Sequence, residues 1–303
     1  MSTLVHVFAD NLLPILLTAT VGFVLARSAG LEARPLGTLT FNALGPALVF
    51  HTIVHSDVQV GDLARMGGFA LATLLVPALV AAGIGRALRL ERTLATSLVL
   101  TVLLSNAGNY GLSVVTLAFD DAAFTQATIF FAVAVAVTWT LGVVVASLGT
   151  THLSAALRGV LRVPPLYAVS AAVVFKSQGW VLPAFLDRPV GLLAQAAIPV
   201  MLVLLGAQLH HNRDVDDGRF VPLAIGLRLV AAPTLALALV PVFGLGDAAR
   251  SAGLVQAAMP TAVVSTVLAE TYGLDAAFVT RVVVLSTLLS PLTLTPLLAW
   301  LGA

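Results

Sequence analysis

Two clusters of helix-breaking residues interrupt long apolar runs of this chain. The first is Ser105-Asn106-Ala107-Gly108-Asn109-Tyr110-Gly111, and the second is Met259-Pro260-Thr261. Gly and Asn are poor helix formers, and Pro removes a backbone N–H and clashes with the carbonyl four residues earlier. A helix opened at membrane depth is tolerated only where it lines a cavity or is buried in protein. Because the N-terminal ends of such half-helices carry positive dipole and N–H groups without partners, we expect them to bind an anion.

The amide and hydroxyl groups around these breaks are the predicted binding residues. Asn106 and Asn109, at i and i+3, are expected to share a face and to supply neutral donors. The break at Pro260 falls 154 residues after Asn106, and paired breaks of this kind are typical of transport sites. The alternative is that the glycines permit close helix packing while the Asn side chains bond to neighbouring helices. The predicted substrate-binding residues here are Asn106, Gly108, Asn109, Gly111, Pro260, Thr261 and Ser265.

Four further polar residues in apolar segments are candidates for the same site. Asn42 and Gln195 each precede a proline by one turn, and are expected to face the cavity or to satisfy carbonyls freed by that proline. Arg228 is close enough to the end of its segment to snorkel, or to reach a substrate carboxylate. Glu270 is the candidate for coupling to protons or sodium, although a solvated carboxylate at a helix end is the plainer interpretation.

A pair of histidines, His51 and His55, has the i, i+4 spacing of metal ligands. The sequence offers no evident third ligand, so we expect the pair to mark the outer end of an apolar segment, with titration as a second option. Neither a metal nor another cofactor is expected. Gln208 is a weaker polar candidate, and the charged stretch 210–217 resembles a solvated loop.

The composition requires a membrane around this chain. Its 303 residues are 59% hydrophobic and 10% charged, against about 25% charged in soluble domains. Mean hydropathy is +1.04. A chain this apolar has more apolar surface than a soluble fold can bury. The net charge of +1 gives no reason to expect nucleic acid as a partner, and the absence of cysteine excludes disulfides and thiolate chemistry.

Apolar runs long enough to span a bilayer predict an all-α protein of ten transmembrane helices. They fall at 8–26, 37–54, 64–85, 95–118, 125–148, 161–178, 189–209, 221–243, 251–270 and 278–300. Short matches recur at a spacing of 154 residues, such as Asp121-Ala-Ala-Phe124 with Asp275-Ala-Ala-Phe278. We therefore predict two five-helix units, 1–149 and 150–303. An odd number of crossings inverts the second unit, a plan used by many secondary transporters.

The distribution of Lys and Arg predicts the orientation. The connections after spans 1, 3, 5 and 7 carry nine of these residues, and those on the opposite face carry four. Both termini are therefore expected on the outer face of the membrane.

Six short segments, in order, resemble the auxin efflux carrier family, which includes plant carriers and bacterial permeases. They are Pro14–Arg27, Phe41–Phe50, Ser105–Leu112, Val163–Leu166, Ile198–Leu209 and Met259-Pro260. The resemblance covers essentially the whole chain. It departs from the family where Ser113 follows Leu112, since many relatives have proline there. The chain also lacks the long hydrophilic loop of the plant carriers, which favours a bacterial-type permease of the inner membrane.

The resemblance implies an inverted-repeat fold with crossing fourth and ninth helices, and a scaffold and a transport domain that give alternating access. The implied function is transport of small organic anions such as auxin, malate or malonate. A sodium-coupled symporter of the bile-acid type is the alternative on the same fold, and a membrane sensor is the alternative of another class. An intramembrane aspartyl protease is not expected, because Asp247 has no second Asp deep within a predicted span. The expected partners are the anion and the lipid bilayer; a homodimer is left open.

Overall fold

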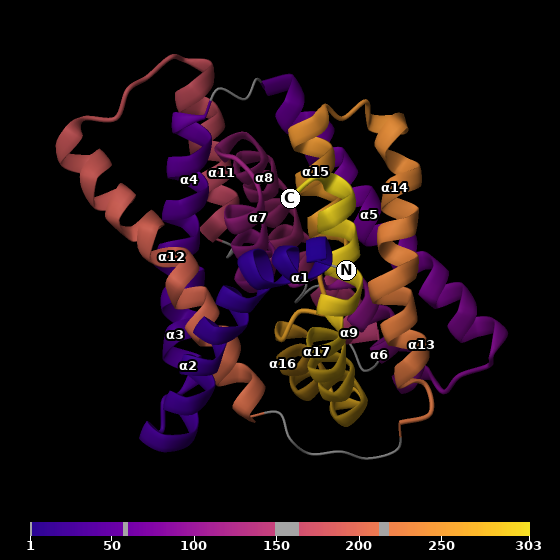
Figure 1. Ribbon diagram of the computed structural model, residues 1–303. Helices are drawn as coiled ribbons and strands as arrows, with labels where there is room; N and C mark the ends of the chain where they lie inside the picture. Colours follow the sequence, from indigo (N-terminus) through magenta and orange to yellow (C-terminus); the bar gives the residue numbers. More distant parts are fainter. Residues whose placement is uncertain (1, 57–59, 149–163, 212–217) are drawn as a thin grey trace.

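The computed structural model describes residues 2–56, 60–148, 164–211 and 218–303, and in these ranges the protein is built from helices (Figure 1). The elements of the first half are α1 (Ser2–Val7), η1 (Phe8–Leu12), α2 (Leu13–Ala29), α3 (Ala33–Leu39), η2 (Thr40–Leu44), α4 (Gly45–His55), α5 (Val60–Ala87), α6 (Arg92–Leu103), η3 (Ala107–Leu112), α7 (Ser113–Ala118), α8 (Asp121–Val137), η4 (Thr138–Gly142) and α9 (Val143–Leu148). Those of the second half are α11 (Pro164–Ser177), α12 (Ala184–His211), α13 (Val221–Gly226), η5 (Leu227–Ala231), α14 (Ala232–Phe243), α15 (Asp247–Ala257), α16 (Val264–Thr271) and α17 (Ala276–Leu301). The prediction of an all-α protein is confirmed for the described residues.

Seven helical runs among the described residues are long and apolar enough to cross a membrane. They are Leu4–Ala29, Ala33–His55, Gly61–Ala87, Asp121–Ser147, Ala184–His210, Val221–Phe243 and Ala276–Leu301, and each coincides with one predicted span. The three other predicted spans are the short helix α11 and the two that contain helix breaks. In those two, α6 is followed by η3 and α7, and α15 is followed by α16.

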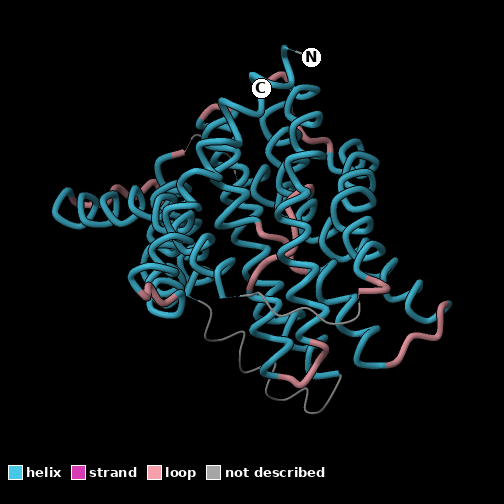
Figure 2. The backbone as a smooth tube through the Cα atoms, turned by 60° about the horizontal axis from the view of Figure 1, so that its bottom comes forward, coloured by secondary structure: helices cyan, strands magenta, loops and turns pink. Residues whose placement is uncertain are grey.

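The two breaks meet and pair with each other inside the protein. The helix α6 ends at Leu103 and α15 ends at Ala257, and Ser105 and Thr261 then form an isolated antiparallel β-bridge. The Asn106 N–H donates to the Pro260 carbonyl at 2.9 Å, and the Ala262 N–H donates to the Leu104 carbonyl at 2.8 Å. Opened backbone groups are thus satisfied by the partner break, as membrane depth requires. Figure 2 shows loop segments in the interior of the helical bundle.

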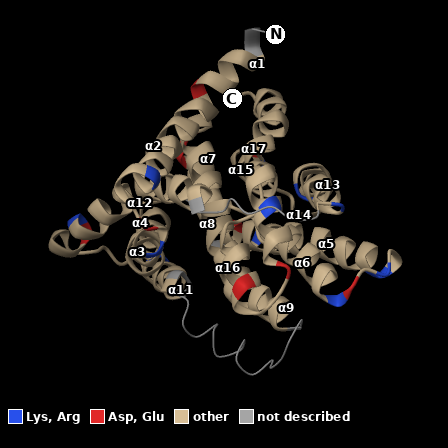
Figure 3. Cartoon of the chain, turned by 90° about the horizontal axis from the view of Figure 1, so that it is seen from below, with Lys and Arg blue, Asp and Glu red and all other residues tan. Residues whose placement is uncertain are grey.

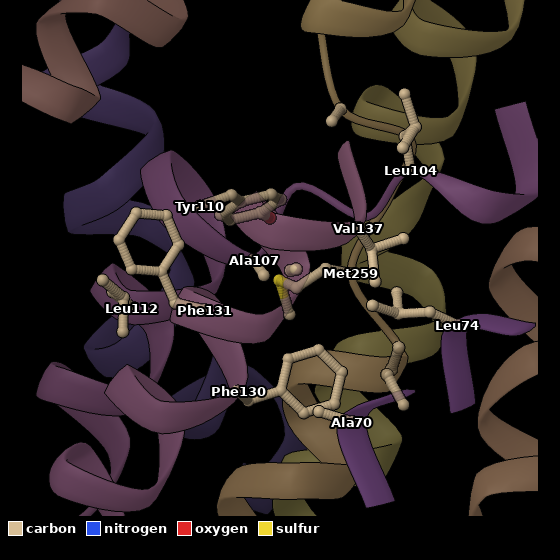
Figure 4. Packing of buried hydrophobic residues seen from close by; sticks show 14 of the residues in the cluster. Ala70, Leu74, Leu104, Ala107, Tyr110, Leu112, Phe130, Phe131, Val137 and Met259 are labelled. Carbon is tan, nitrogen blue, oxygen red and sulfur yellow. The ribbon is translucent and has the colours of Figure 1, made fainter. Parts of the chain in front are cut away.

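Apolar side chains surround this crossing. Tyr110, Phe130 and Met259 are fully buried. Figure 4 shows Met259 in the centre of the cluster, with Ala107 and Tyr110 beside it and Phe130 below. This close packing holds the two breaks in place.

Prolines explain three of the five π-helical segments in the described part of the chain. Pro14, Pro46 and Pro233 each follow the end of a π-helical segment by two residues, after η1, η2 and η5 respectively. In each case the residue before the proline donates its N–H to the carbonyl five residues earlier, as Gly45 does to Thr40. A wider turn relieves the clash between a proline ring and the carbonyl four residues back. The prolines therefore bulge these helices without ending them.

The helices pack in two groups. The first helix group consists of α2, α3, α4, α11 and α12, where α12 packs on α2, α3 and α4, and α11 packs on α4. The second helix group consists of α5, α6, α8, α14, α15, α16 and α17, packed around the crossing. In Figure 1 the first group lies on the left, and α5 and α14 lie on the right.

Charged residues are sparse along the helices (Figure 3), and acidic residues cap two helix starts. The Asp120 carboxylate accepts from the Ala123 N–H at 2.9 Å, and the Asp275 carboxylate accepts from the Phe278 N–H at 2.9 Å. In the sequence, Asp121 is the residue that matches Asp275. In the structure, Asp120 has the capping role of Asp275, because each of these two carboxylates accepts from the N–H of the residue three positions later.

Candidate functional site

A cavity of about 1010 Å³ lies between the two helix groups. On the side of the first group it is lined by α3, by α12, by the first residue of α4 and by η2, which leads into α4. On the side of the second group it is lined by α8, α16, both breaks, the segment η3 that follows the first break and the segment η4 that follows α8. The residues that carry polar side chains are Glu32, Arg34, Thr38, Thr40, Asn42, Ser105, Asn106, Asn109, Thr138, Trp139, Gln208, Thr266 and Glu270. This is the size class of small-molecule sites in proteins.

Two helix N-termini lie at the wall of this cavity. Asn106 is the N-cap of the η3–α7 half-helix, and Val263 is the N-cap of α16. Asn106, Ala107 and Gly108 line the cavity at the first start, and Val263 and Val264 at the second. Because the first N–H groups of a helix have no partner within it and carry the positive end of the dipole, both starts favour a negative charge here.

The amide groups of Asn106 and Asn109 line the same wall. Asn106 is 4% exposed, and its side-chain Nδ2 has no hydrogen-bond partner among the described residues. Its backbone is engaged, since the Asn106 carbonyl accepts from the Gly111 N–H at 3.0 Å. A buried amide donor without a partner is costly unless a ligand or water completes it.

Three more predicted site residues lie at this cavity. Asn42 lines it from η2 while its Nδ2 donates to the Thr38 carbonyl at 2.9 Å. Gly108 lines it where a Cβ would lie 2.6 Å from Cε2 of Phe131, so the glycine permits close packing. Glu270 lines it near the end of α16 and is exposed, as the plainer interpretation of this carboxylate predicts.

Four predicted residues around the breaks do not line the cavity, and three of them contact other residues of the crossing. A Cβ on Gly111 would lie 2.2 Å from Oε1 of Gln256. Thr261 donates its hydroxyl to the Thr101 carbonyl at 2.9 Å, and Pro260 contributes the carbonyl that pairs with Asn106. Ser265 is fully buried, and its Oγ has no hydrogen-bond partner among the described residues.

Arg228 occupies a position that the sequence does not predict. It is fully buried, so it does not snorkel, and it is absent from the residues that line the cavity. Its guanidinium donates to the carbonyls of Met259 at 2.7 Å, Val102 at 3.0 Å and Ala257 at 2.9 Å. The carbonyls of Val102 and Ala257 lie at the C-terminal ends of α6 and α15, where the helix dipole is negative, and Met259 lies two residues beyond α15. One cation therefore caps both half-helices.

Gln195 lies elsewhere, on an exposed part of α12 beside His51 and Asp187, where it lines a smaller hollow. It does not lie at the large cavity with Asn42. The matching positions of the two residues in the sequence therefore do not bring them together.

Several cavity residues are missing from the predicted set. Phe41 of η2 and Trp139 of η4 both line the cavity, and their ring centroids are 5.2 Å apart. The signal for Trp139 is a tryptophan in the middle of a span, away from the interfaces where this residue is usual. Arg34 lines the cavity near Glu32, and Gln208, the weaker candidate, lines it from α12.

Comparison with known proteins identifies the class. Residues 150–298 match the family described as membrane transport protein. The chain is 25% identical over 294 residues to an uncharacterized transporter of Methanothermobacter thermautotrophicus, covering 94% of this chain and 95% of the relative. The second half of the chain is thus similar to that family, and nearly the whole chain is similar to one transporter. This similarity agrees with the resemblance to the auxin efflux carriers.

The transporter is thus a multi-pass membrane protein, with seven described helical runs long enough to cross the bilayer. Similarity to membrane transport proteins favours transport over intramembrane catalysis. In the structure, Asp247 begins α15 and is exposed, which suits a helix-start carboxylate.

Proposed function

We propose that the protein is a secondary carrier of small organic anions, with carboxylates such as auxin, malate or malonate as the substrate class. The observation that carries this proposal is the convergence of two half-helix N-termini, at Asn106 and Val263, on one cavity. The amides of Asn106 and Asn109 would donate to the carboxylate, and the Phe41–Trp139 pair would contact its apolar part. Helix starts and neutral donors bind an anion without a buried counter-charge.

Alternating access is the mechanism we propose for this carrier. Its ten spans would form two inverted five-helix units, 1–149 and 150–303, with the broken fourth and ninth spans crossing at Ser105 and Thr261. The first helix group would act as the scaffold and the second as the moving body. The position of the cavity between the two groups supports this division, since sliding one group would close one mouth and open another.

The cavity would open toward the cytoplasm in this conformation. Glu32 and Arg34, which line it, lie at the connection after the first span, and the Lys and Arg distribution predicts that this connection is cytoplasmic. Both termini would then lie on the outer face of a bacterial inner membrane.

Arg228 argues against the sodium-coupled alternative. The C-terminal ends of broken helices, with their free carbonyls, are where such carriers coordinate sodium. Here the guanidinium of Arg228 holds carbonyls at the ends of both α6 and α15. Because the guanidinium of Arg228 already supplies a positive charge at these carbonyls, a sodium ion is not needed there. Uptake is therefore expected to proceed equally with and without a sodium gradient. Sodium-dependent uptake into proteoliposomes would instead favour the symporter.

Proton coupling through Glu270 is an extension of the proposal. This carboxylate lines the cavity and is exposed, so water in the cavity can reach it. A pH gradient should drive uptake by the wild type, and Glu270→Gln should uncouple it while leaving downhill flux. If a pH gradient drives no uptake by the wild type, Glu270 has no coupling role.

The decisive experiment measures transport by Asn109→Ala in proteoliposomes. Thermal stabilisation against a panel of mono- and dicarboxylates first identifies the substrate. Loss of a hydrogen bond to a charged group, about 1.5–3 kcal/mol, should lower uptake by roughly 10- to 100-fold. The control is Thr20→Ala, which removes an exposed hydroxyl bonded only within its own helix. Wild-type flux in Asn109→Ala would count against the site, and binding without any net flux would favour a sensor.

A further inference from the structure

The structure completes the histidine pair with a third ligand from a distant part of the chain. His51 and His55 lie in the last two turns of α4, and Asp187 lies in the first turn of α12. One potential ligand atom from each of the three residues lies within 4.8 Å of the others. The two imidazole rings are stacked, with centroids 4.2 Å apart. Among the described residues this is the group that could hold a metal ion.

The hydrogen bonding of His55 prepares it as a metal ligand. Its Nδ1 lies 2.9 Å from the His51 carbonyl, an acceptor, so Nδ1 carries the proton. The lone pair is then on Nε2, which faces Asp187. Metal-bound histidines almost always donate their other ring N–H to a carbonyl or carboxylate in this way, which fixes the tautomer and the ring orientation.

The distance between His55 and Asp187 suits a shared metal better than a hydrogen bond. His55 Nε2 and Asp187 Oδ1 are 3.3 Å apart, and this buried Oδ1 has no hydrogen-bond partner. With zinc bonds of about 2.0–2.2 Å to nitrogen and oxygen, neighbouring ligand atoms in a tetrahedral site are about 3.3 Å apart. The distance between His55 Nε2 and Asp187 Oδ1 therefore equals the distance expected between two ligand atoms of one zinc ion.

The surroundings leave room for the ion and its solvent ligand. A hollow of about 380 Å³ is lined by His51, Asp187, Arg188, Gly191, Leu192 and Gln195. Gly191 is one turn after Asp187, and a Cβ there would lie 3.2 Å from His51 Nε2, so the glycine keeps that nitrogen accessible. The nearby cation Lys176 is engaged elsewhere, because its Nζ donates to the Ser56 carbonyl at the end of α4. Arg188 is exposed and can extend into solvent.

We propose that His51, His55 and Asp187 form a site for a divalent transition-metal ion of the zinc class, with water as the remaining ligand. Two imidazoles and one carboxylate are a ligand set that such ions accept, with a fourth position left open. Magnesium and calcium are disfavoured, because they require mostly oxygen ligands.

The bound ion would join two helices of the first helix group. It would tie the end of α4 to the start of α12. The two histidines lie six and ten residues after Gly45, and Gly45 is the last residue of α4 that lines the cavity. Because both helices belong to the same group, the ion would stabilise that group without bridging the cavity. Metal binding should therefore raise thermal stability and leave the transport cavity unchanged.

The test uses the purified full chain, without a polyhistidine tag and stripped with chelator, titrated with Zn²⁺ by calorimetry and by thermal unfolding. We expect one equivalent of Zn²⁺ to bind and the unfolding temperature to rise, with no rise on adding Mg²⁺ or Ca²⁺. Asp187→Asn keeps the shape of the side chain but removes the anionic ligand, and it should weaken Zn²⁺ binding at least 10- to 100-fold. His55→Ala should do the same.

The matched control is His6→Ala, which removes an exposed histidine outside the cluster and should bind Zn²⁺ as the wild type does. Elution and unfolding of each variant without metal verify that it is folded. The proposal is overturned if the wild type binds no stoichiometric Zn²⁺, or if folded Asp187→Asn binds it as tightly as the wild type. Neither result depends on the transport assay, so the site and the proposed function are tested separately.

Discussion

At the scale of single residues, the cavity combines neutral amides with one aromatic pair. Trp139 lines the cavity, whereas Trp180 and Trp300, the other two tryptophans, are 55% and 54% exposed at other places. A bound substrate should therefore change the emission of Trp139 alone. We expect the substrate-dependent change in tryptophan fluorescence to vanish in Trp139→Phe. The change should persist in Trp180→Phe, and its loss there would contradict this placement of the ligand.

The amide of Asn106 allows a test of the charge that the cavity accepts. Asn106→Asp is nearly isosteric, and it introduces a carboxylate beside the expected anion. We expect the affinity for the substrate to fall at least 10-fold, about 1.4 kcal/mol, in thermal-shift titrations. Gln178→Glu makes the same chemical change at an exposed position and should have no effect. Tighter binding of the substrate by Asn106→Asp would indicate that the substrate is a cation and would contradict the proposed anion.

The sequence locates part of this cavity and misses the rest for a geometric reason. Asn106, Gly108 and Asn109 stand at a visible helix break, so their exposure to a cavity follows from local chemistry. Thr261 and Ser265 follow the other break, but they turn into the protein, where Thr261 bonds to Thr101 across the crossing. Which face of a broken helix points to the cavity depends on the packing of distant helices, and no local pattern encodes it.

At the scale of helices, Arg228 links the two breaks. Its removal would leave the carbonyls of Val102, Ala257 and Met259 without this donor in a buried place. Each unsatisfied buried group costs about 1–3 kcal/mol, so Arg228→Met should destabilise the protein by at least about 3 kcal/mol. Thermal unfolding in detergent measures this effect, with the exposed Arg86→Met as the control. Arg228→Lys should be intermediate, because an ammonium cannot reproduce the planar fork of a guanidinium.

Equal stability of Arg228→Met and the wild type would show that the carbonyls find other donors. The sequence could not predict this role, since the three acceptors lie 29 to 126 residues from Arg228. The same limit applies to Asp187, whose partners lie in α4. Seven predicted spans, by contrast, coincide with helices because length and apolar composition are local properties.

The helices α2 and α12 approach each other through glycines. A Cβ on Gly206 would lie 1.7 Å from the Ala19 carbonyl oxygen, and one on Gly22 would lie 2.0 Å from the Val203 carbonyl oxygen. Backbone atoms cannot rotate away as side chains can, so Gly206→Ala must separate the helices. We expect it to destabilise the protein by about 1–3 kcal/mol. Gly83→Ala, in a helix with open space around it, should be neutral or stabilising by up to about 1 kcal/mol. The difference in unfolding temperature between the two variants is the measurement.

At the scale of the whole molecule, the two helix groups and the cavity between them predict which side of the membrane reaches the site. The chain contains no cysteine, so single cysteines can be labelled without background. Thr38 is exposed and lines the cavity, near the connection expected in the cytoplasm. Asp247 is exposed at the start of α15, next to a connection expected outside.

A membrane-impermeant maleimide should therefore label Thr38→Cys in inside-out vesicles and Asp247→Cys in intact cells, each from one side alone. Substrate should slow the labelling of Thr38→Cys by about 3-fold or more, because a population shift toward the closed or opposite state removes the open mouth. The rate for Asp247→Cys should not change, since it lies outside the cavity. Labelling of Thr38→Cys from the outer side alone would reverse the orientation. Equal labelling from both sides would mean that the empty carrier alternates freely between its two conformations. Such a carrier would allow net downhill flux of the substrate, as a facilitative uniporter does.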